Sequence, residues 1–367
     1  MQARPTCFLK LEIEAMRRFL LLFVVLAVVS ASVQAAPPTE GGIPMRLTAI
    51  HKADMLYVQA LAKLTRAIDE TTGKQIRPER FTSGQKGSEA ETLLEQIQGN
   101  LEGGYISAIS LAQQLPAFQT LAIPLLFTKP EHVRAFIGSQ LDIALRETAK
   151  SKKLLVLGYA SSGFYGILNF RPGEPKEAPP SLSNLIVRIP KNPWMVEVHQ
   201  SLGLRPFTLP SADLPDAITS GWVQGVSATP EILNRTSFIN TTASAFHHTR
   251  HLHGWMVLVL NLEWFNRLNP DLQTAITNAA NSVLPQSLEQ SLAQEQKILN
   301  KWSSDKLFSI LTPEPTDEMK NLALKTAGEM EKLLNLPGVI TQGWEKNQLV
   351  SAPSRSDNKK LKPRATP

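Results

Sequence analysis

The sequence predicts an α/β protein that is large enough for two domains. Its 367 residues, 43% hydrophobic and 19% charged, have the balance of a globular protein with a sizeable core. From residue 46 onward, short apolar strands alternate with amphipathic helices, which favours a mainly parallel sheet. A further predicted strand, Leu185 to Ile189, carries Arg188 at its middle and is closed by Pro190, because proline cannot continue a sheet ladder.

The first part of the chain is predicted to contain three strands separated by two helices. The first helix has apolar residues three to four positions apart, and the second begins at the candidate N-cap Ser88 and stops at Gly99. Strands are expected at 46–50, 74–81 and 101–111, and helices at 55–71 and 88–98.

The rest of the chain continues the alternation. Gly163 and Gly166 flank Tyr165 after a strand at 154–159 and predict a bend where a strand can pass between domains and hinge. Pro285 lies inside the longest predicted helix and would kink it. Helices are expected at 193–203, 214–220, 269–302 and 316–334, and a strand at 222–226.

Arg188 is the candidate for binding a ligand. An arginine held on a buried strand needs an anion, and its planar guanidinium matches a carboxylate with two hydrogen bonds. The alternative is a structural arginine paired with an acidic neighbour at the sheet edge, since such ion pairs are common.

Charge and targeting signals place the protein outside the cytoplasm. The formal charge of +6 comes from residues 1–35, which carry +2, and residues 351–367, which carry +4, so the remaining body is neutral and gives no reason to expect nucleic-acid binding. A signal peptide is predicted over residues 1–35, with an uncleaved anchor as the alternative. The pattern that predicts it is Arg17-Arg18, then an apolar run from Phe19 to Val29, then a small-residue motif ending at Ala35. The single cysteine, Cys7, would be removed with it, so no disulfide is expected. The basic tail, 351–367, is expected to be disordered.

The stretch from Leu182 to Pro230 resembles the solute-binding proteins of tripartite ATP-independent periplasmic (TRAP) transporters. It contains a strand ending in Arg-hydrophobe-Pro, a helix ending in Leu202-Gly203, a second helix and a strand leading to Pro230. The likeness extends from about residue 47 to about residue 302. It departs from the family pattern in the last strand, where Gln224 replaces an aspartate.

The resemblance implies a two-lobed fold, like type II periplasmic binding proteins, with a long inter-domain helix and a ligand cleft between the lobes. It implies a first lobe of residues 45–161 plus about 254–293, and a second of residues 162–253 plus about 294–350. The function implied is that of an extracytoplasmic receptor that closes over an organic acid and delivers it to the transporter's membrane subunits. A periplasmic monomer with no cofactor is expected.

The same resemblance implies which residues contact the ligand. Arg188 would bind the carboxylate, while Tyr165 stands where most family members have a second arginine. We therefore expect one carboxylate, on a ligand with hydroxy, keto or aromatic character. The further candidates for ligand contact are Trp194, Ser211, Ser227, Ala228 and Thr229.

No catalytic or metal-binding motif is recognisable in the sequence. His247, His248, His251 and His253 lie within seven residues, but no carboxylate or cysteine close in sequence completes a metal site. We expect these histidines on a strand at a solvated cleft or edge, with His247, His251 and His253 on one face. The alternatives to a transport receptor are a sensor or interaction protein that retained the fold, and a secreted enzyme.

Overall fold

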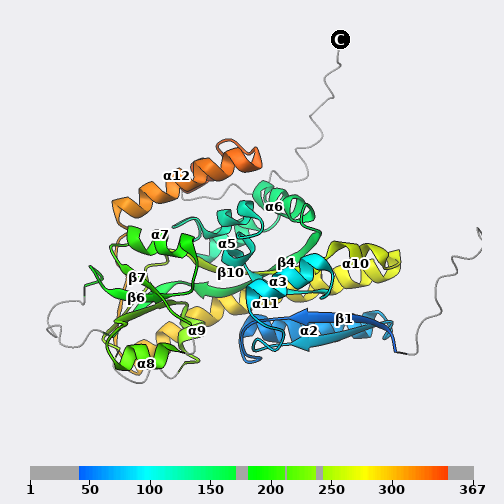
Figure 1. Ribbon diagram of the computed structural model, residues 1–367, viewed down its shortest axis with the longest axis horizontal. Helices are drawn as coiled ribbons and strands as arrows, with labels where there is room; N and C mark the ends of the chain where they lie inside the picture. The colour runs from blue at the N-terminus through cyan, green and yellow to red at the C-terminus, as the bar shows by residue number, and fades with distance from the viewer. Residues whose placement is uncertain (1–40, 171–180, 211–212, 237–242, 346–367) are drawn as a thin grey trace, which may run out of the picture. The chain divides into compact units, whose positions relative to one another are not determined.

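A computed structural model describes residues 41–170, 181–210, 213–236 and 243–345 (Figure 1). The predicted signal peptide at 1–35, the basic tail at 351–367 and the candidate Ser211 lie outside these residues. The described elements form two sheets, each with its own helices.

The first sheet has five strands in the order β2-β1-β3-β10-β4. Strands β1 and β3 are parallel, as expected from the alternation of strands and helices, but β10 runs antiparallel to both β3 and β4. The prediction of a mainly parallel sheet is therefore wrong here, because a strand from much later in the chain inserts between β3 and β4. The bounds are β1 (Ile43–Thr48), β2 (Ile76–Phe81), β3 (Gly103–Ser107), β4 (Leu154–Phe164) and β10 (His253–Asn261).

The two helices that the sequence predicted in this part of the chain, α2 and α3, begin within one residue of the predicted positions. In α3, Ser88 accepts a hydrogen bond from the backbone N–H of Glu91, whose side chain accepts from the backbone N–H of Ser88, and Gly99 ends the helix in a left-handed conformation. The helices associated with the first sheet are α2 (Leu56–Thr71), α3 (Glu89–Gln98), α4 (Ala108–Leu111), the 3-10 helix η1 (Pro116–Ala122), α5 (Pro130–Phe136), α6 (Gln140–Lys150) and α10 (Leu262–Arg267).

The second sheet has six short strands in the order β11-β9-β5-β8-β6-β7 and is also mixed. Strand β6 is parallel to β7 and β8, whereas β5 is antiparallel to β8 and β9. The strands are β5 (Gly166–Asn169), β6 (Ile186–Ile189), β7 (Arg205–Thr208), β8 (Gly225–Ala228), β9 (Ala245–His247) and β11 (Ser309–Leu311). The later helices are α7 (Pro193–Ser201), α8 (Leu214–Thr219), α9 (Pro230–Leu233), α11 (Pro270–Ser304), α12 (Asp317–Leu334) and α13 (Val339–Glu345).

The long helix α11 joins the cores of both sheets. Its side chains Ile276 and Leu284 pack in one core of the first sheet, Leu288 packs in the other, and Leu299 and Trp302 pack in a core of the second. In Figure 1 it passes behind both groups of strands. The helix continues through Pro285, where the missing N–H removes one backbone hydrogen bond.

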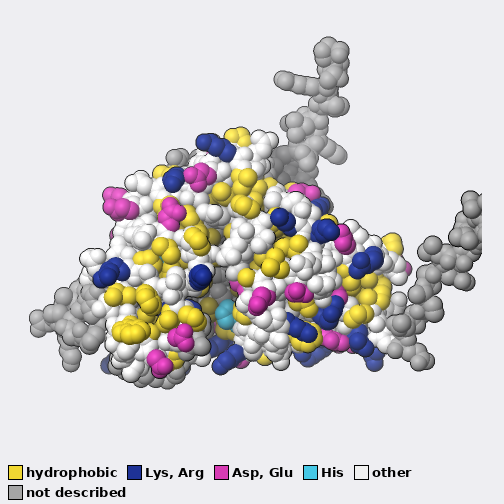
Figure 2. All heavy atoms as spheres, viewed as in Figure 1, with side chains coloured by type: hydrophobic (Ala, Val, Ile, Leu, Met, Phe, Trp, Pro, Cys, Tyr) yellow, Lys and Arg dark blue, Asp and Glu magenta, His cyan; other side chains and the backbone are white. Residues whose placement is uncertain are grey.

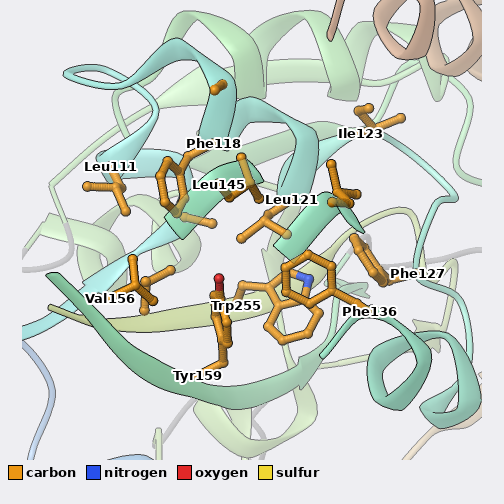
Figure 3. Packing of buried hydrophobic residues seen from close by; sticks show 14 of the residues in the cluster. Leu111, Phe118, Leu121, Ile123, Phe127, Phe136, Leu145, Val156, Tyr159 and Trp255 are labelled. Carbon is orange, nitrogen blue, oxygen red and sulfur yellow. The ribbon is translucent and has the colours of Figure 1, made fainter. Parts of the chain in front are cut away.

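The first sheet rests on a dense aromatic core. The Trp255 ring lies 5.0 Å from Phe136, 5.1 Å from Phe127 and 5.6 Å from Tyr159, centroid to centroid and edge to face. Figure 3 shows these rings converging from β4, β10, α5 and the segment after η1. Because such rings bury large areas, they hold the strands that face the second sheet in fixed positions.

Two strand expectations in the later part of the chain are wrong. The strand expected at 222–226 begins at Gly225, and Trp222 is 71% exposed in the turn before it. The histidine segment is not one strand either: β9 ends at His247, and β10 starts at His253.

Candidate functional site

A cavity of about 280 Å³ is lined by residues of both sheets. Figure 2 shows the hollow near the middle of this face, with a histidine side chain at its edge. In the first sheet, parts of the lining follow β1 and β3 and another part is the start of β10. In the second sheet, the lining lies at and after the ends of β6 and β8. Its polar lining includes His51, Glu89, Ser107, Ser110, Gln113, Ser162, Tyr165, Arg188, Lys191, Asn192, Ser227 and His253.

Arg188 lies on β6, which is next to the edge strand β7 of the second sheet, and it lines this cavity. Its backbone pairs with Phe207 of β7 on one side and Val226 of β8 on the other, so strands on both sides fix its position. The Nε–H donates to the Leu209 carbonyl at 2.9 Å, which orients the half-buried guanidinium. Burial lowers the pKa of Arg188 below its ordinary value, but a guanidinium remains charged.

Tyr165 lines the cavity at the junction of β4 and β5, where the chain passes from the first sheet to the second. Its backbone N–H donates to Leu252 and its carbonyl accepts from the N–H of Arg250, both at 2.9 Å. Burial raises the pKa of Tyr165 to about 12; Glu89 adds to the rise and Arg188 opposes it. The phenol is therefore neutral near neutral pH and lies within reach of both charges.

The glycines beside Tyr165 are required by close packing. Gly163 has φ +105°, and a Cβ there would lie 2.5 Å from Oε2 of Glu295. A Cβ on Gly166 would lie 2.2 Å from the Phe246 ring. The crossing between the sheets therefore leaves no room for a side chain at either position.

Two of the three candidates on and after β8 line the cavity. Ser227 and Ala228 are in the lining, and Thr229 lies just beyond it at the start of α9. Within the described part of the chain, neither Oγ of Ser227 nor Oγ1 of Thr229 has a hydrogen-bond partner. A buried hydroxyl without a partner is costly, so Ser227 is available to a ligand in the cavity.

Trp194 lies outside the cavity lining. Its Nε1–H donates to the Ala122 carbonyl at 2.8 Å, and its ring packs on a core of the second sheet. The structure thus brings together Arg188, Tyr165, Ser227 and Ala228, but not Trp194.

The histidines are buried, which corrects the expectation of a solvated position, although His253 does line the cavity. His247, His248, His251 and His253 are all at most 3% exposed. Burial lowers the pKa of His247 to about 4 and that of His253 to about 3, so both are neutral near neutral pH. In the described ranges, no group of three or more histidine, cysteine, aspartate or glutamate side chains is arranged to hold a metal ion.

Residues 48–332 match the model of the bacterial extracellular solute-binding protein family 7 (DctP). The chain belongs to this family. Its members are binding proteins rather than enzymes, and the two sheets with the cavity between them are the two lobes of this fold. The proposed boundaries of the lobes remain a prediction. Among the described residues, no helix is long and apolar enough to cross a membrane.

Individual relatives of this family member are distant. The chain is 20% identical to the 2,3-diketo-L-gulonate-binding periplasmic protein of Escherichia coli over 66% of this chain and 73% of that protein. A solute-binding protein of Roseobacter denitrificans is 24% identical over 60% of this chain and 67% of that protein.

Solved structures of TRAP periplasmic solute-binding proteins share the fold. One from Ochrobactrum anthropi has a TM-score of 0.73 at 21% identity, covering 88% of this chain and 99% of that one. One from Sulfitobacter, with bound β-D-galacturonate, has a TM-score of 0.70 at 21% identity, covering 80% and 98%.

Sequence reasoning missed the part of the site that the first lobe contributes. Glu89, Ser107 and Ser110 line the cavity and are hydrogen-bonded to one another, although 18 to 21 positions separate the serines from Glu89. One signal was available: Ser107 lies in the predicted strand region 101–111 and ends β3 in the structure, and ligands bind near the carboxyl ends of such strands. Glu89 follows the N-cap Ser88 and reads as an ordinary acidic residue of a first helical turn.

Proposed function

We propose that this protein is the receptor of a TRAP-type transporter and captures an organic acid, with Arg188 binding the ligand's carboxylate. The single observation that carries the proposal is the position of Arg188, a half-buried guanidinium that lines the cavity between the lobes, on a strand paired on both sides. Two further groups, Tyr165 and the partnerless hydroxyl of Ser227, line the same cavity and can donate hydrogen bonds to an acid.

The ligands bound to structural neighbours support an acid. Besides galacturonate in the Sulfitobacter protein, they are galactonate in a protein of Advenella mimigardefordensis and pyroglutamic acid in one of Bordetella pertussis. Each of these ligands has one carboxyl group, as expected for a cavity with one buried arginine.

The test is calorimetry of variants on an acid found by thermal-shift screening. A desolvated arginine–carboxylate pair costs about 2–5 kcal/mol to break, so Arg188→Ala should weaken binding by about 30- to several-thousand-fold. Arg188→Lys should recover only part of this, because an ammonium cannot form the two parallel hydrogen bonds. Arg205→Ala, on the exposed edge of the neighbouring strand β7, is the matched control and should bind normally. Unchanged affinity in a folded Arg188→Ala variant would refute the proposal.

Delivery of the ligand requires closure of the lobes and docking on membrane subunits of the transporter. The bend at Gly163 and Gly166 supports a hinge there, since a few residues at such a crossing can absorb a domain rotation. Small-angle scattering should therefore show compaction when the ligand is added.

Secretion to the periplasm, with cleavage after Ala35, is proposed from the sequence, and the intact mass of periplasmic protein tests it.

A further inference from the structure

We infer that Glu89 selects acids with a hydrogen-bond donor, a hydroxyl or an ammonium, at the end remote from the carboxylate, and that it rejects a second carboxylate there. This inference rests on the proposed function of Arg188, and it concerns the opposite wall of the same cavity. Glu89 lies in the first turn of α3 in the first lobe, whereas Arg188 lies on β6 in the second.

In its hydrogen bonds, the Glu89 carboxylate acts only as an acceptor. Its Oε1 accepts from the backbone N–H of Ser107 at 2.7 Å, and a backbone N–H can only donate. Its Oε2 accepts from the hydroxyl of Ser107 at 2.7 Å and from that of Ser110 at 2.5 Å. The Ser107 hydroxyl in turn accepts from the N–H of Ser110 at 3.2 Å, which directs its own proton toward Glu89. The network fixes the carboxylate in one orientation at the cavity wall.

Glu89 retains capacity for one more donor. A carboxylate offers about four acceptor sites, and the three donors above occupy three of them. In the described part of the chain no arginine or lysine forms a salt bridge with Glu89. A donor on the ligand is therefore the partner that the cavity can bring to it.

The charge of Glu89 acts inside the cavity rather than on bulk solvent. It helps to raise the pKa of Tyr165 and of Tyr57, and it opposes the fall that burial causes in the pKa of His51. Arg188 also acts on the pKa of Tyr165, which it lowers. The first-lobe wall thus carries a negative charge at Glu89 and the second-lobe wall a positive charge at Arg188, with Lys191 also in the lining. A ligand that contacts both Glu89 and Arg188 must be an anion toward Arg188 and a donor toward Glu89.

A second carboxylate at the Glu89 end would face a fixed like charge. Two carboxylates that share a site cannot both stay ionised without cost, so a dicarboxylate must take up a proton or leave that end unbound. A hydroxyl or an ammonium forms instead a hydrogen bond to a charged acceptor, which is stronger than a neutral one.

The test compares acids that differ only at the far end. One set is butyrate, γ-hydroxybutyrate, γ-aminobutyrate and succinate, and a second is gluconate and glucarate. Wild-type protein should bind at least one of the donor-bearing acids more tightly than butyrate, and it should bind succinate and glucarate more weakly than their hydroxylated partners by about 10- to 100-fold. Preference for γ-hydroxybutyrate over γ-aminobutyrate identifies a hydroxyl as the donor, and the reverse identifies an ammonium.

Glu89→Gln keeps the shape of the side chain and removes its charge, so the penalty on the dicarboxylates should largely disappear. Glu91→Gln is the matched control: it lies on the same helix and retains a capping group, but it does not line the cavity. Glu89→Ala removes the carboxylate altogether and is the second variant without the charge if Glu89→Gln does not fold; the penalty on the dicarboxylates should disappear there too.

Two outcomes separate the inference from the function on which it rests. If acids bind and lose affinity in Arg188→Ala, but wild-type protein takes succinate and glucarate as readily as the hydroxy acids, the inference fails and the receptor function stands. A penalty that persists unchanged in folded Glu89→Gln overturns it as well. If wild-type protein binds no acid of either set or of the wider screen, both fail.

Discussion

The two walls of the cavity hold their charged groups in different ways. On the second lobe, Arg188 is placed by strand pairing on both sides and oriented by the carbonyl of Leu209, and the nearby Ser227 hydroxyl has no partner among the described residues. On the first lobe, Glu89 is held by three donors from Ser107 and Ser110. One wall presents Arg188 and the Ser227 hydroxyl to an acid, and the other presents a preformed acceptor. We therefore expect affinity to depend mainly on the first of these and discrimination mainly on the second.

The second-lobe wall is also backed by a buried histidine, and we therefore expect stability to depend on pH. Behind the second-lobe wall, His199 of α7 is buried against His251, with ring centroids 5.0 Å apart, and burial lowers the pKa of His199 to about 4. Its Nδ1 lies 2.6 Å from the carbonyl of Met195, which itself lines the cavity.

The largest of the remaining effects should be a loss of stability in acid. The unfolded chain binds a proton at His199 near pH 6.5, whereas the folded one does so only near pH 4. Stability is therefore complete above pH 6.5 and falls as the pH drops toward 4, by on the order of 3 kcal/mol for this residue. Urea unfolding across this range measures it. His199→Asn, which cannot be protonated, should show a shallower fall, and an equally steep fall in that variant would contradict the assignment.

A smaller effect on ligand binding is expected from a contact that joins the two lobes. The N-terminus of α2 in the first lobe has no capping side chain of its own at Met55; the N–H of Leu56 donates to Glu231 Oε1 of α9 at 2.7 Å. Arg235 reaches Asp54 beside it at 2.9 Å. Loss of a helix cap costs about 0.5–2 kcal/mol, so Glu231→Ala, which removes the acceptor, should weaken ligand binding by about 2- to 30-fold, by favouring separated lobes.

Scattering of the ligand-bound Glu231→Ala variant should show reduced compaction. Glu263→Ala is its control, because the exposed pair of Glu263 with Lys153 joins residues associated with the same sheet. If the Glu231 variant matched the wild type in both affinity and compaction, this contact would have no part in closure.

The smallest effect should come from Trp194. Trp194→Phe retains a ring but loses the 2.8 Å hydrogen bond to Ala122, at a cost of about 1 kcal/mol. Calorimetry should show less than about tenfold weaker binding. Because Trp194 does not line the cavity, a far larger loss would contradict its position and would return the ring to the set of ligand contacts.

Local signals in the sequence were sufficient for most elements and for one wall of the site. The capping box of Ser88 and Glu91, the N-caps Asn269 and Thr316, and the Arg188 strand ending at Pro190 are each made by residues a few positions apart. Their physics is local, so the pattern alone predicts the structure.

Tertiary structure decided what depends on distant partners. Strand β10 enters the first sheet about 150 residues after β3, so the order and direction of the strands could not be read from local alternation. The histidines look solvated in a sequence window, yet they are at most 3% exposed, and the rings that contact them, such as His199 and Phe127, come from distant parts of the chain. Glu89 becomes a site residue only when the end of β3 brings Ser107 to it. A sequence determines which side chains are polar, but burial and opposing charge are properties of the folded arrangement.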